Sequence, residues 1–121
     1  MAMFGEMEAA IMDAVWAAEA PVTVREILGE LPAEREPAYT TVQTITEILH
    51  RKGWLARAKD GKAFRYTATA PREEYTARLM DEALAQTTDR TAALVHFADR
   101  LDPAEAAELA AALQRAAGGQ T

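Results

Sequence analysis

The sequence has 121 residues and a mass of 13.2 kDa, which gives room for one domain, or for a small head with a helical appendage. Half of the residues are apolar, but 28 residues are alanine, so the core of one chain is thin and association with a second copy is expected. The absence of cysteine excludes disulfides, thiolate metal sites and thiol catalysis, and it is typical of a reducing cytoplasm. Because there is no apolar run of bilayer length and no leader-like N-terminus, we expect no membrane insertion and a cytoplasmic location.

The charge is distributed unevenly along the chain. The net charge of −6, from 13 basic and 19 acidic residues, argues against polyanion binding by the whole surface. Residues 50–65, however, hold six basic residues against Asp60 alone, whereas residues 71–121 hold five basic and nine acidic residues. The sequence therefore concentrates its cations on one segment.

Apolar residues recur at helical spacing through the first half of the chain. A first helix is expected over residues 6–18, and a second follows Thr23, whose hydroxyl can cap it. A polar loop with two prolines is expected over residues 32–37. A third helix is expected over residues 40–52, with Gly53 as its left-handed cap.

The third helix has an unusual outer face. Val42, Ile45 and Leu49 mark its buried side, and one of its threonines is expected to cap its N-terminus. The opposite side is rich in short donors and acceptors, which suit base edges and phosphate oxygens better than a plain solvent face does. That side holds Thr40, Gln43, Thr44, Glu47 and Arg51.

After Gly53 the periodicity changes from helical to alternating. Two strands, over residues 54–59 and 62–67, flank Asp60-Gly61, which is a strong signal for a hairpin turn. The order of three helices and a hairpin is that of a winged helix-turn-helix, in which the third helix enters the major groove and the hairpin reaches phosphate. The candidate DNA-binding residues are Tyr39, Thr40, Thr41, Gln43, Thr44, Arg51, Lys52, Arg57, Lys59, Lys62 and Arg65.

Residues 71–121 predict three short, alanine-rich helices. Pro71 suits the first turn of one, with Thr69 as its cap; Thr88 opens the next, and Asp102-Pro103 caps the last. The predicted fold is mainly α with one small β-hairpin: a winged helix-turn-helix DNA-binding domain over residues 1–70 and a helical dimerisation domain over residues 71–121. The residues expected to form the dimer interface are Tyr75, Leu79, Leu94, Phe97, Leu101, Leu109 and Leu113.

Several motifs, in the same order, resemble those of the penicillinase-repressor family (the BlaI, MecI and CopY type). The recognition-helix motif of the family resembles Ala38-Tyr39-Thr40-Thr41-Val42-Gln43-Thr44-Ile45 followed by Lys52-Gly53-Trp54-Leu55. The start of the family pattern is similar to residues 5–16, its wing to residues 61–66, and its C-terminal helix to residues 92–97. The resemblance covers nearly the whole chain and implies a homodimeric transcriptional repressor that binds a palindromic operator.

The resemblance also bears on regulation. Family members with a β-lactam role are inactivated when a membrane sensor protease triggers cleavage in the dimerisation region, which implies a candidate cleavage site between His96 and Phe97. Phe97 is equally well explained as a core residue. Two positions depart from the family pattern. Ile48 stands where arginine is usual and could enlarge the apolar face, and Glu47 would repel phosphate unless it accepts from a cytosine amino group.

The sequence offers little support for functions other than DNA binding. No catalytic motif, phosphate-binding loop or cofactor motif is present, and Asp99 and Asp102 near His96 are better explained as a solvated helix surface than as a metal site, so we expect neither an enzyme nor a metalloprotein. Two alternatives stay open. One is a winged-helix repressor that senses a small molecule directly; the other is a protein-interaction module that docks through its third helix.

Overall fold

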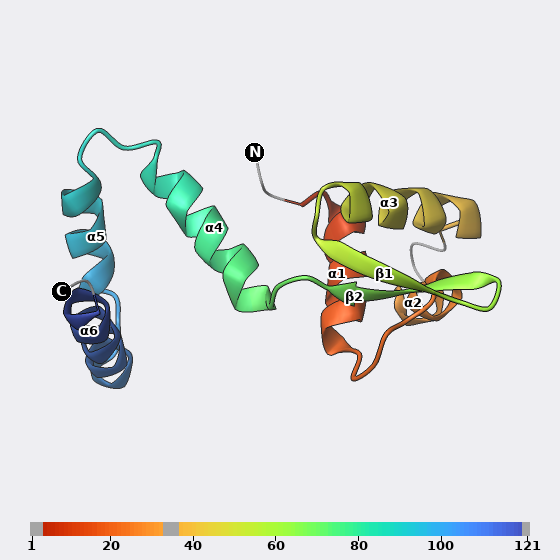
Figure 1. Ribbon diagram of the computed structural model, residues 1–121. Coiled ribbons are helices and arrows are strands. Elements are labelled where there is room, and N and C mark those ends of the chain that lie inside the picture. Colours follow the sequence, from red (N-terminus) through yellow and green to blue (C-terminus); the bar gives the residue numbers. More distant parts are fainter. Residues whose placement is uncertain (1–3, 33–36, 120–121) are drawn as a thin grey trace. The chain divides into compact units, whose positions relative to one another are not determined.

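The computed structural model describes residues 4–32 and 37–119, and this part of the chain contains six helices and one two-stranded antiparallel sheet (Figure 1). The chain divides into two compact units, one ending at Met80 and the other beginning at Asp81. The predicted fold class, mainly helical with one hairpin, is confirmed. The loop expected over residues 32–37 lies mostly outside the described residues.

Three helices open the first unit: α1 (Glu6–Ala17), α2 (Val24–Glu30) and α3 (Tyr39–Arg51). Thr23 caps α2 as predicted. Its hydroxyl accepts from the amide of Glu26 at 3.1 Å, and the Glu26 carboxylate accepts from the amide of Thr23 at 2.9 Å. The helices meet in a core whose fully buried side chains are Ile11, Met12, Ile27, Val42, Thr46, Leu49 and Leu55.

Two details of α3 differ from the sequence-based prediction. The residue that precedes it, Ala38, has no side-chain capping group, so the prediction that a threonine caps this helix is wrong. Thr46 is fully buried on the core side, a place that the apolar pattern did not predict for it. Its hydroxyl donates to the Val42 carbonyl oxygen at 2.7 Å, and a polar group satisfied in this way is tolerated in a core.

The hairpin follows α3 directly. Gly53 has a φ of +90° and ends the helix as predicted, and β1 (Leu55–Asp60) pairs with β2 (Ala63–Ala68). The two turn residues are Gly61-Lys62 rather than Asp60-Gly61, because Gly61, with a φ of +65°, takes the first turn position. β2 packs against α1 and β1 against α3, which fixes the hairpin on the helical core (Figure 1).

The start of α4 (Arg72–Leu84) belongs to the first unit. Tyr75 joins an aromatic cluster with Phe4, Trp16 and Trp54, with ring centroids between 4.1 and 6.1 Å from that of Tyr75. The prediction that Thr69 caps this helix is wrong. Its hydroxyl donates to the Gly53 carbonyl oxygen at 2.7 Å and so ties the end of β2 to the end of α3.

The second unit contains the end of α4, then α5 (Arg90–Ala98) and α6 (Pro103–Gly118). Asp89, not Thr88, caps α5, and Leu101 lies beyond its end. Asp102 caps α6 with Pro103 in the first turn, as predicted. None of the described helices has the length and apolar character needed to cross a bilayer. No residue of α4, α5 or α6 is buried, and the large apolar side chains left exposed on these helices are Met80, Leu94, Val95, Phe97, Leu109 and Leu113.

Candidate nucleic-acid interface

The N-terminal half of α3 presents a polar surface to solvent. Its exposed residues are Thr40, Thr41, Gln43 and Thr44. Tyr39 is also exposed, with 38% of its surface accessible to solvent. Because Ala38 offers no capping side chain, the first amides of the helix have no side-chain acceptor. Such an end favours an anion, through both the free amides and the helix dipole.

The polar side chains on this surface differ in how much freedom they have. The Thr44 hydroxyl donates to the Thr40 carbonyl oxygen at 2.9 Å, which leaves its lone pairs as acceptors. The Gln43 amide has no hydrogen-bond partner among the described residues, so both its donors and its acceptor remain available. Gln43 is therefore the side chain best suited to read a base edge, where a bidentate pair with adenine is the usual contact.

Four of the predicted DNA-binding cations already have carboxylate partners. Arg51 lies 3.5 Å from Glu47, and Lys52 lies 2.9 Å from Glu8. Burial alone would raise the pKa of Glu8, but hydrogen bonds from Lys52 and from the amide of Gly5 lower it overall. Arg57 and Arg65 also contact carboxylates. Within the described part of the chain, Lys59 and Lys62 are the predicted hairpin cations that have no such partner.

Glu47 and Ile48, the two departures from the family pattern, have different surroundings in the structure. Glu47 contacts both Arg51 and Arg57, so its carboxylate holds two cations beside α3. The Arg57 guanidinium also lies 4.2 Å from the ring centroid of Phe64, and its pKa is raised, first by a hydrogen bond with the Tyr66 hydroxyl and then by Glu47. Ile48 is 37% exposed, so it does not enlarge the buried face of the helix.

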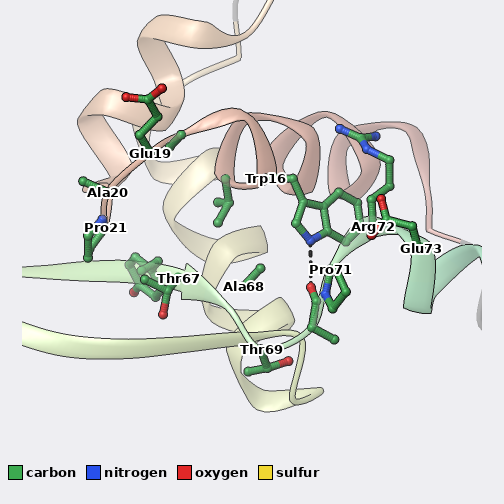
Figure 2. A pocket seen from close by; sticks show the side chains of 14 residues that line it. Trp16, Glu19, Ala20, Pro21, Thr67, Ala68, Thr69, Pro71, Arg72 and Glu73 are labelled. Carbon is green, nitrogen blue, oxygen red and sulfur yellow. Dashed lines mark hydrogen bonds between the residues drawn. The ribbon is translucent and has the colours of Figure 1, made fainter.

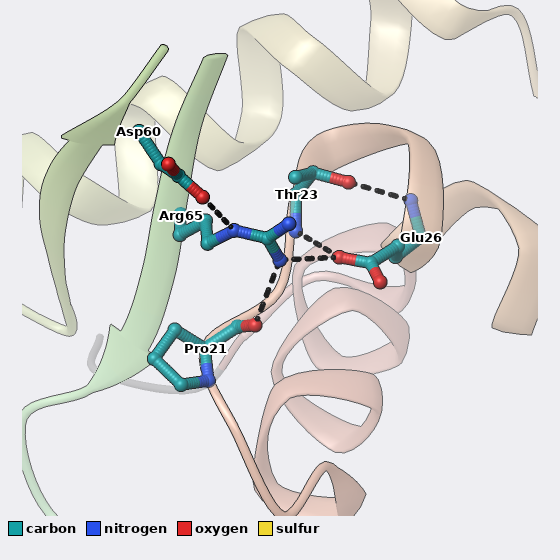
Figure 3. A network of polar contacts seen from close by, with 5 residues as sticks. All are labelled: Pro21, Thr23, Glu26, Asp60 and Arg65. Carbon is teal, nitrogen blue, oxygen red and sulfur yellow. Dashed lines mark hydrogen bonds and ion pairs between the residues drawn. The ribbon is translucent and has the colours of Figure 1, made fainter.

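Arg65 contacts groups of both the hairpin and the segment around the start of α2 (Figure 3). Its Nε donates to Asp60 Oδ2 at 2.7 Å, and its Nη1 donates to Glu26 Oε1 at 3.1 Å and to the Pro21 carbonyl oxygen at 3.3 Å. The pKa of Arg65 is raised, mainly by the hydrogen bond to Asp60. This residue joins the hairpin to the start of α2.

A hollow of about 430 Å³ brings the predicted residues of α3 and the hairpin together. Tyr39 and Gln43 line it from α3, and Lys62 and Phe64 from the hairpin. Arg25 of α2 lines it too, with its guanidinium 5.2 Å from the ring centroid of Tyr39. Arg25 was not predicted from the sequence, because only the buried apolar face of this helix was used there. The signal that could have identified Arg25 was its position on the outward face of the helix.

The predicted dimerisation residues fall into two groups. Leu94, Phe97, Leu109 and Leu113 are between 43% and 61% exposed, whereas Leu79 and Leu101 are partly covered. Tyr75 lies in the first unit, where it contacts aromatic residues of its own chain. Its predicted role in dimerisation stays a prediction. His96 and Phe97, the candidate cleavage site, are exposed residues within α5.

A second hollow, of about 620 Å³, lies between the end of α1, β2 and the start of α4 (Figure 2). Trp16 and Pro71 line it, and the Trp16 Nε1 donates to the Ala70 carbonyl oxygen at 2.9 Å. No buried side-chain nitrogen or oxygen among the described residues lacks a hydrogen-bond partner. The walls of this hollow therefore hold no buried polar side-chain group waiting for a small-molecule ligand.

The sequence and fold have clear matches among known proteins. The family described as penicillinase repressor matches residues 4–115. The chain is similar to a transcriptional regulator, BlaI, from Mycobacterium tuberculosis, with 42% identity over 118 residues, covering 95% of this chain and 86% of the relative. It is also similar, at 34% identity over 64 residues, to an uncharacterised 16.5 kDa protein from Latilactobacillus sakei, covering 53% of this chain and 43% of that protein.

Two solved structures have related folds. The solution structure of the DNA-binding domain of the repressor BlaI matches with a TM-score of 0.53 and 26% identity, covering 60% of this chain and 88% of that domain. The crystal structure of the transcriptional regulator Tm0710 from Thermotoga maritima matches with a TM-score of 0.50 and 17% identity, covering 94% of this chain and 74% of that one. The second match extends the similarity in fold to the helices after the hairpin.

Proposed function

Because this chain belongs to the penicillinase repressor family, we propose that it binds double-stranded DNA as a transcriptional repressor, with α3 in the major groove and the hairpin as its wing. The same membership confirms that the chain is not an enzyme. The observation that carries the proposal is the uncapped, polar N-terminal half of α3, which shares one hollow with Lys62 at the tip of the hairpin.

In the proposed interface, some residues read base edges and others bind phosphate. Gln43 and the threonines of α3 face the base edges, since their side chains are short, exposed and able to donate or accept. Lys59 and Lys62 contact phosphate, and Arg25 and Tyr39 contact the DNA backbone beside the N-terminus of α3. Arg51, Lys52 and Arg57 add positive charge that is reduced by Glu47 and Glu8.

We propose that two copies associate through the second unit and bind a palindromic operator. Supporting this, Leu94, Leu109 and Leu113 of α5 and α6 remain exposed in the single chain. Exposed apolar side chains on several helices are typical of a surface that a partner covers. Alanine elsewhere on these helices lets a second set of helices approach closely.

Relief of repression is proposed to follow from cleavage between His96 and Phe97, triggered by a membrane sensor protease system. The support is that this bond lies in α5 among the residues assigned to the dimer interface. Cutting it would detach Phe97 and all of α6 from the rest of the chain. Direct small-molecule sensing has less support, because the hollow beside Trp16 presents no unpartnered buried polar side chain among the described residues.

Selection from a pool of random DNA duplexes tests the proposal. The purified full chain should enrich a sequence with twofold symmetry and half-sites about one helical turn, roughly 10 base pairs, apart. Gln43→Ala keeps a good helix former on the surface, so it should relax the preference at one base pair of each half-site and weaken operator binding by about 1–3 kcal/mol per half-site. Failure to enrich any sequence would contradict DNA recognition, and an enriched sequence without symmetry would contradict the dimer.

A further inference from the structure

We infer that Arg65 is a positioning residue that fixes the wing against α2, rather than one of the cations that contact phosphate. This inference rests on the proposed function, since it concerns how the wing meets DNA. It reverses the role that the sequence suggested for Arg65, which was grouped with Lys62 because both are basic residues of the hairpin. The contacts of the two side chains differ in kind.

The strand geometry separates Arg65 from Arg57 and Lys59, the two cations of the first strand. In the observed register Arg57 pairs with Tyr66 and Lys59 with Phe64, so these residues share one face of the hairpin. Arg65 pairs with Ala58 and therefore points from the other face, the same face as Asp60. There it meets α2 instead of α3 (Figure 3).

The Glu26 carboxylate, which accepts a hydrogen bond from Arg65, is itself held in place by the fold. Glu26 Oε1 already accepts from the amide of Thr23 at 2.9 Å in the capping box of α2. Next to it, Val22 and Tyr66 exchange two backbone hydrogen bonds of 3.0 and 2.7 Å, which attach β2 to the segment before α2. Arg65 extends this attachment from the strand to Asp60, beside the turn that carries Lys62.

The charges around Arg65 argue against a direct phosphate contact. One guanidinium faces two carboxylates, those of Asp60 and Glu26, so the cluster carries a net charge of −1. To reach phosphate, Arg65 would have to leave both partners and place two unpaired carboxylates near the DNA backbone, which like charges disfavour. Lys62 has no carboxylate partner among the described residues and reaches phosphate at no such cost.

The two roles predict opposite effects for Glu26→Gln. If Arg65 binds phosphate, removing the carboxylate frees the guanidinium and DNA binding becomes tighter. If Arg65 positions the wing, the same change loosens the wing and binding becomes weaker, even though a negative charge has been removed. Glutamine also occurs at this position of a capping box, so α2 keeps its cap. Glu30→Gln removes a charge from the same helix without touching Arg65 and serves as the matched control.

The test uses the full chain and the duplex that it selects, with affinity measured at several salt concentrations. Glu26→Gln and Arg65→Gln should each weaken binding about threefold or more, the double variant should be no weaker than Arg65→Gln alone, and Glu30→Gln should not weaken binding. The salt slope should stay at the wild-type value for Arg65→Gln but fall by about 0.9 per head for Lys62→Gln. Tighter binding by Glu26→Gln, or a slope for Arg65→Gln reduced as for Lys62→Gln, would overturn the inference.

Amide hydrogen exchange in the DNA-free chain separates this inference from the proposed function. Both Glu26→Gln and Arg65→Gln should speed exchange at the amides of Val22 and Tyr66, which bond to each other's carbonyl oxygens, whereas Glu30→Gln should leave them unchanged. Unchanged exchange in the first two variants would overturn the positioning role. Absence of sequence selection by the wild-type chain would instead contradict the proposed function and leave the exchange result to decide whether Arg65 holds the wing.

Discussion

The ring of Tyr75 stacks on the ring of Phe4, with centroids 4.1 Å apart and planes inclined by 4°, and its hydroxyl oxygen accepts from the backbone amide of Phe4 at 2.6 Å. The two residues are 71 positions apart, one before α1 and the other on α4. This contact makes the start of α4 part of the DNA-binding head. The sequence suggested that the head ends at residue 70. We propose instead that it extends to Met80.

Replacing Tyr75 should destabilise the head. Tyr75→Ala removes the stacked ring and its contact with Trp54, and should lower the free energy of unfolding by about 2–3 kcal/mol. Tyr75→Phe keeps the ring and removes only the acceptor, at a cost of about 1 kcal/mol. Urea unfolding at one protein concentration, followed by the fluorescence of Trp16 and Trp54, measures both. Equal losses would show that the ring contributes nothing beyond the hydrogen bond.

Placing a charge on the exposed apolar face of α6 should break the proposed dimer. Leu113 is 61% exposed in the single chain, so Leu113→Asp changes little in the monomer but would bury a carboxylate in the interface. Association should become at least about a hundredfold weaker, as measured by sedimentation. Gln114→Asp, at the neighbouring exposed position, is the control and should leave the dimer intact. An unchanged dimer with Asp at residue 113 would place the interface elsewhere.

Salt dependence should identify the cations that contact phosphate. Lys59→Gln and Lys62→Gln each remove a cation that has no carboxylate partner among the described residues. Each should reduce the slope of log affinity against log salt by about 1.8 for a dimer, or 0.9 per head. Lys52→Gln removes a cation paired with Glu8 and should reduce the slope less. The same reduction for all three variants would show that the ion pair with Glu8 opens on DNA.

The contribution of Glu26 to stability should depend on pH. Hydrogen bonds from Thr23, first of all from its backbone amide, and the charge of Arg65 hold the pKa of Glu26 below its usual value. A carboxyl whose pKa is lowered on folding stabilises the fold above its unfolded pKa of about 4.3, and this stabilisation is lost as the pH falls through the folded value. The stability difference between the wild type and Glu26→Gln should therefore be present at pH 7 and decrease as the pH is lowered below about 4.3 in urea titrations. A difference that does not change with pH would assign it to the shape of the side chain instead of its charge.

The sequence predicted the elements of the head well, because each has a local cause. Alternating and helical apolar spacing, the cap at Thr23 and the positive φ at Gly53 are set by a few neighbouring residues. The same reasoning placed Gln43 on an exposed helix face, where the structure has it. Periodicity is enough to find such positions, since it depends only on the repeat of the element.

Contacts between distant parts of the chain could not be predicted in this way. Thr69 was expected to cap a helix but bonds to the Gly53 carbonyl oxygen, and Tyr75 contacts Phe4. Arg65 is basic and lies on the hairpin, but its partner Glu26 is 39 residues away. Charge and spacing reveal which residues can bind phosphate. They do not show which cations the fold has already paired with carboxylates.

Truncating the chain after His96 should leave the head folded but weaken its binding to DNA. Both tryptophans and the core around Leu49 precede this point, so a chain that ends at His96 keeps the first unit intact and should show wild-type tryptophan fluorescence. It lacks Phe97 and α6, so it should sediment as a monomer. Operator affinity should then fall by a factor of about 10²–10⁴, because the second half-site is no longer bound at high effective concentration. In the intact chain the peptide bond between His96 and Phe97 lies within α5. Proteolysis at this bond should therefore require local opening of the helix and proceed slowly. A tight dimer formed by the shortened chain would exclude this cleavage as the switch and make direct ligand sensing the better hypothesis.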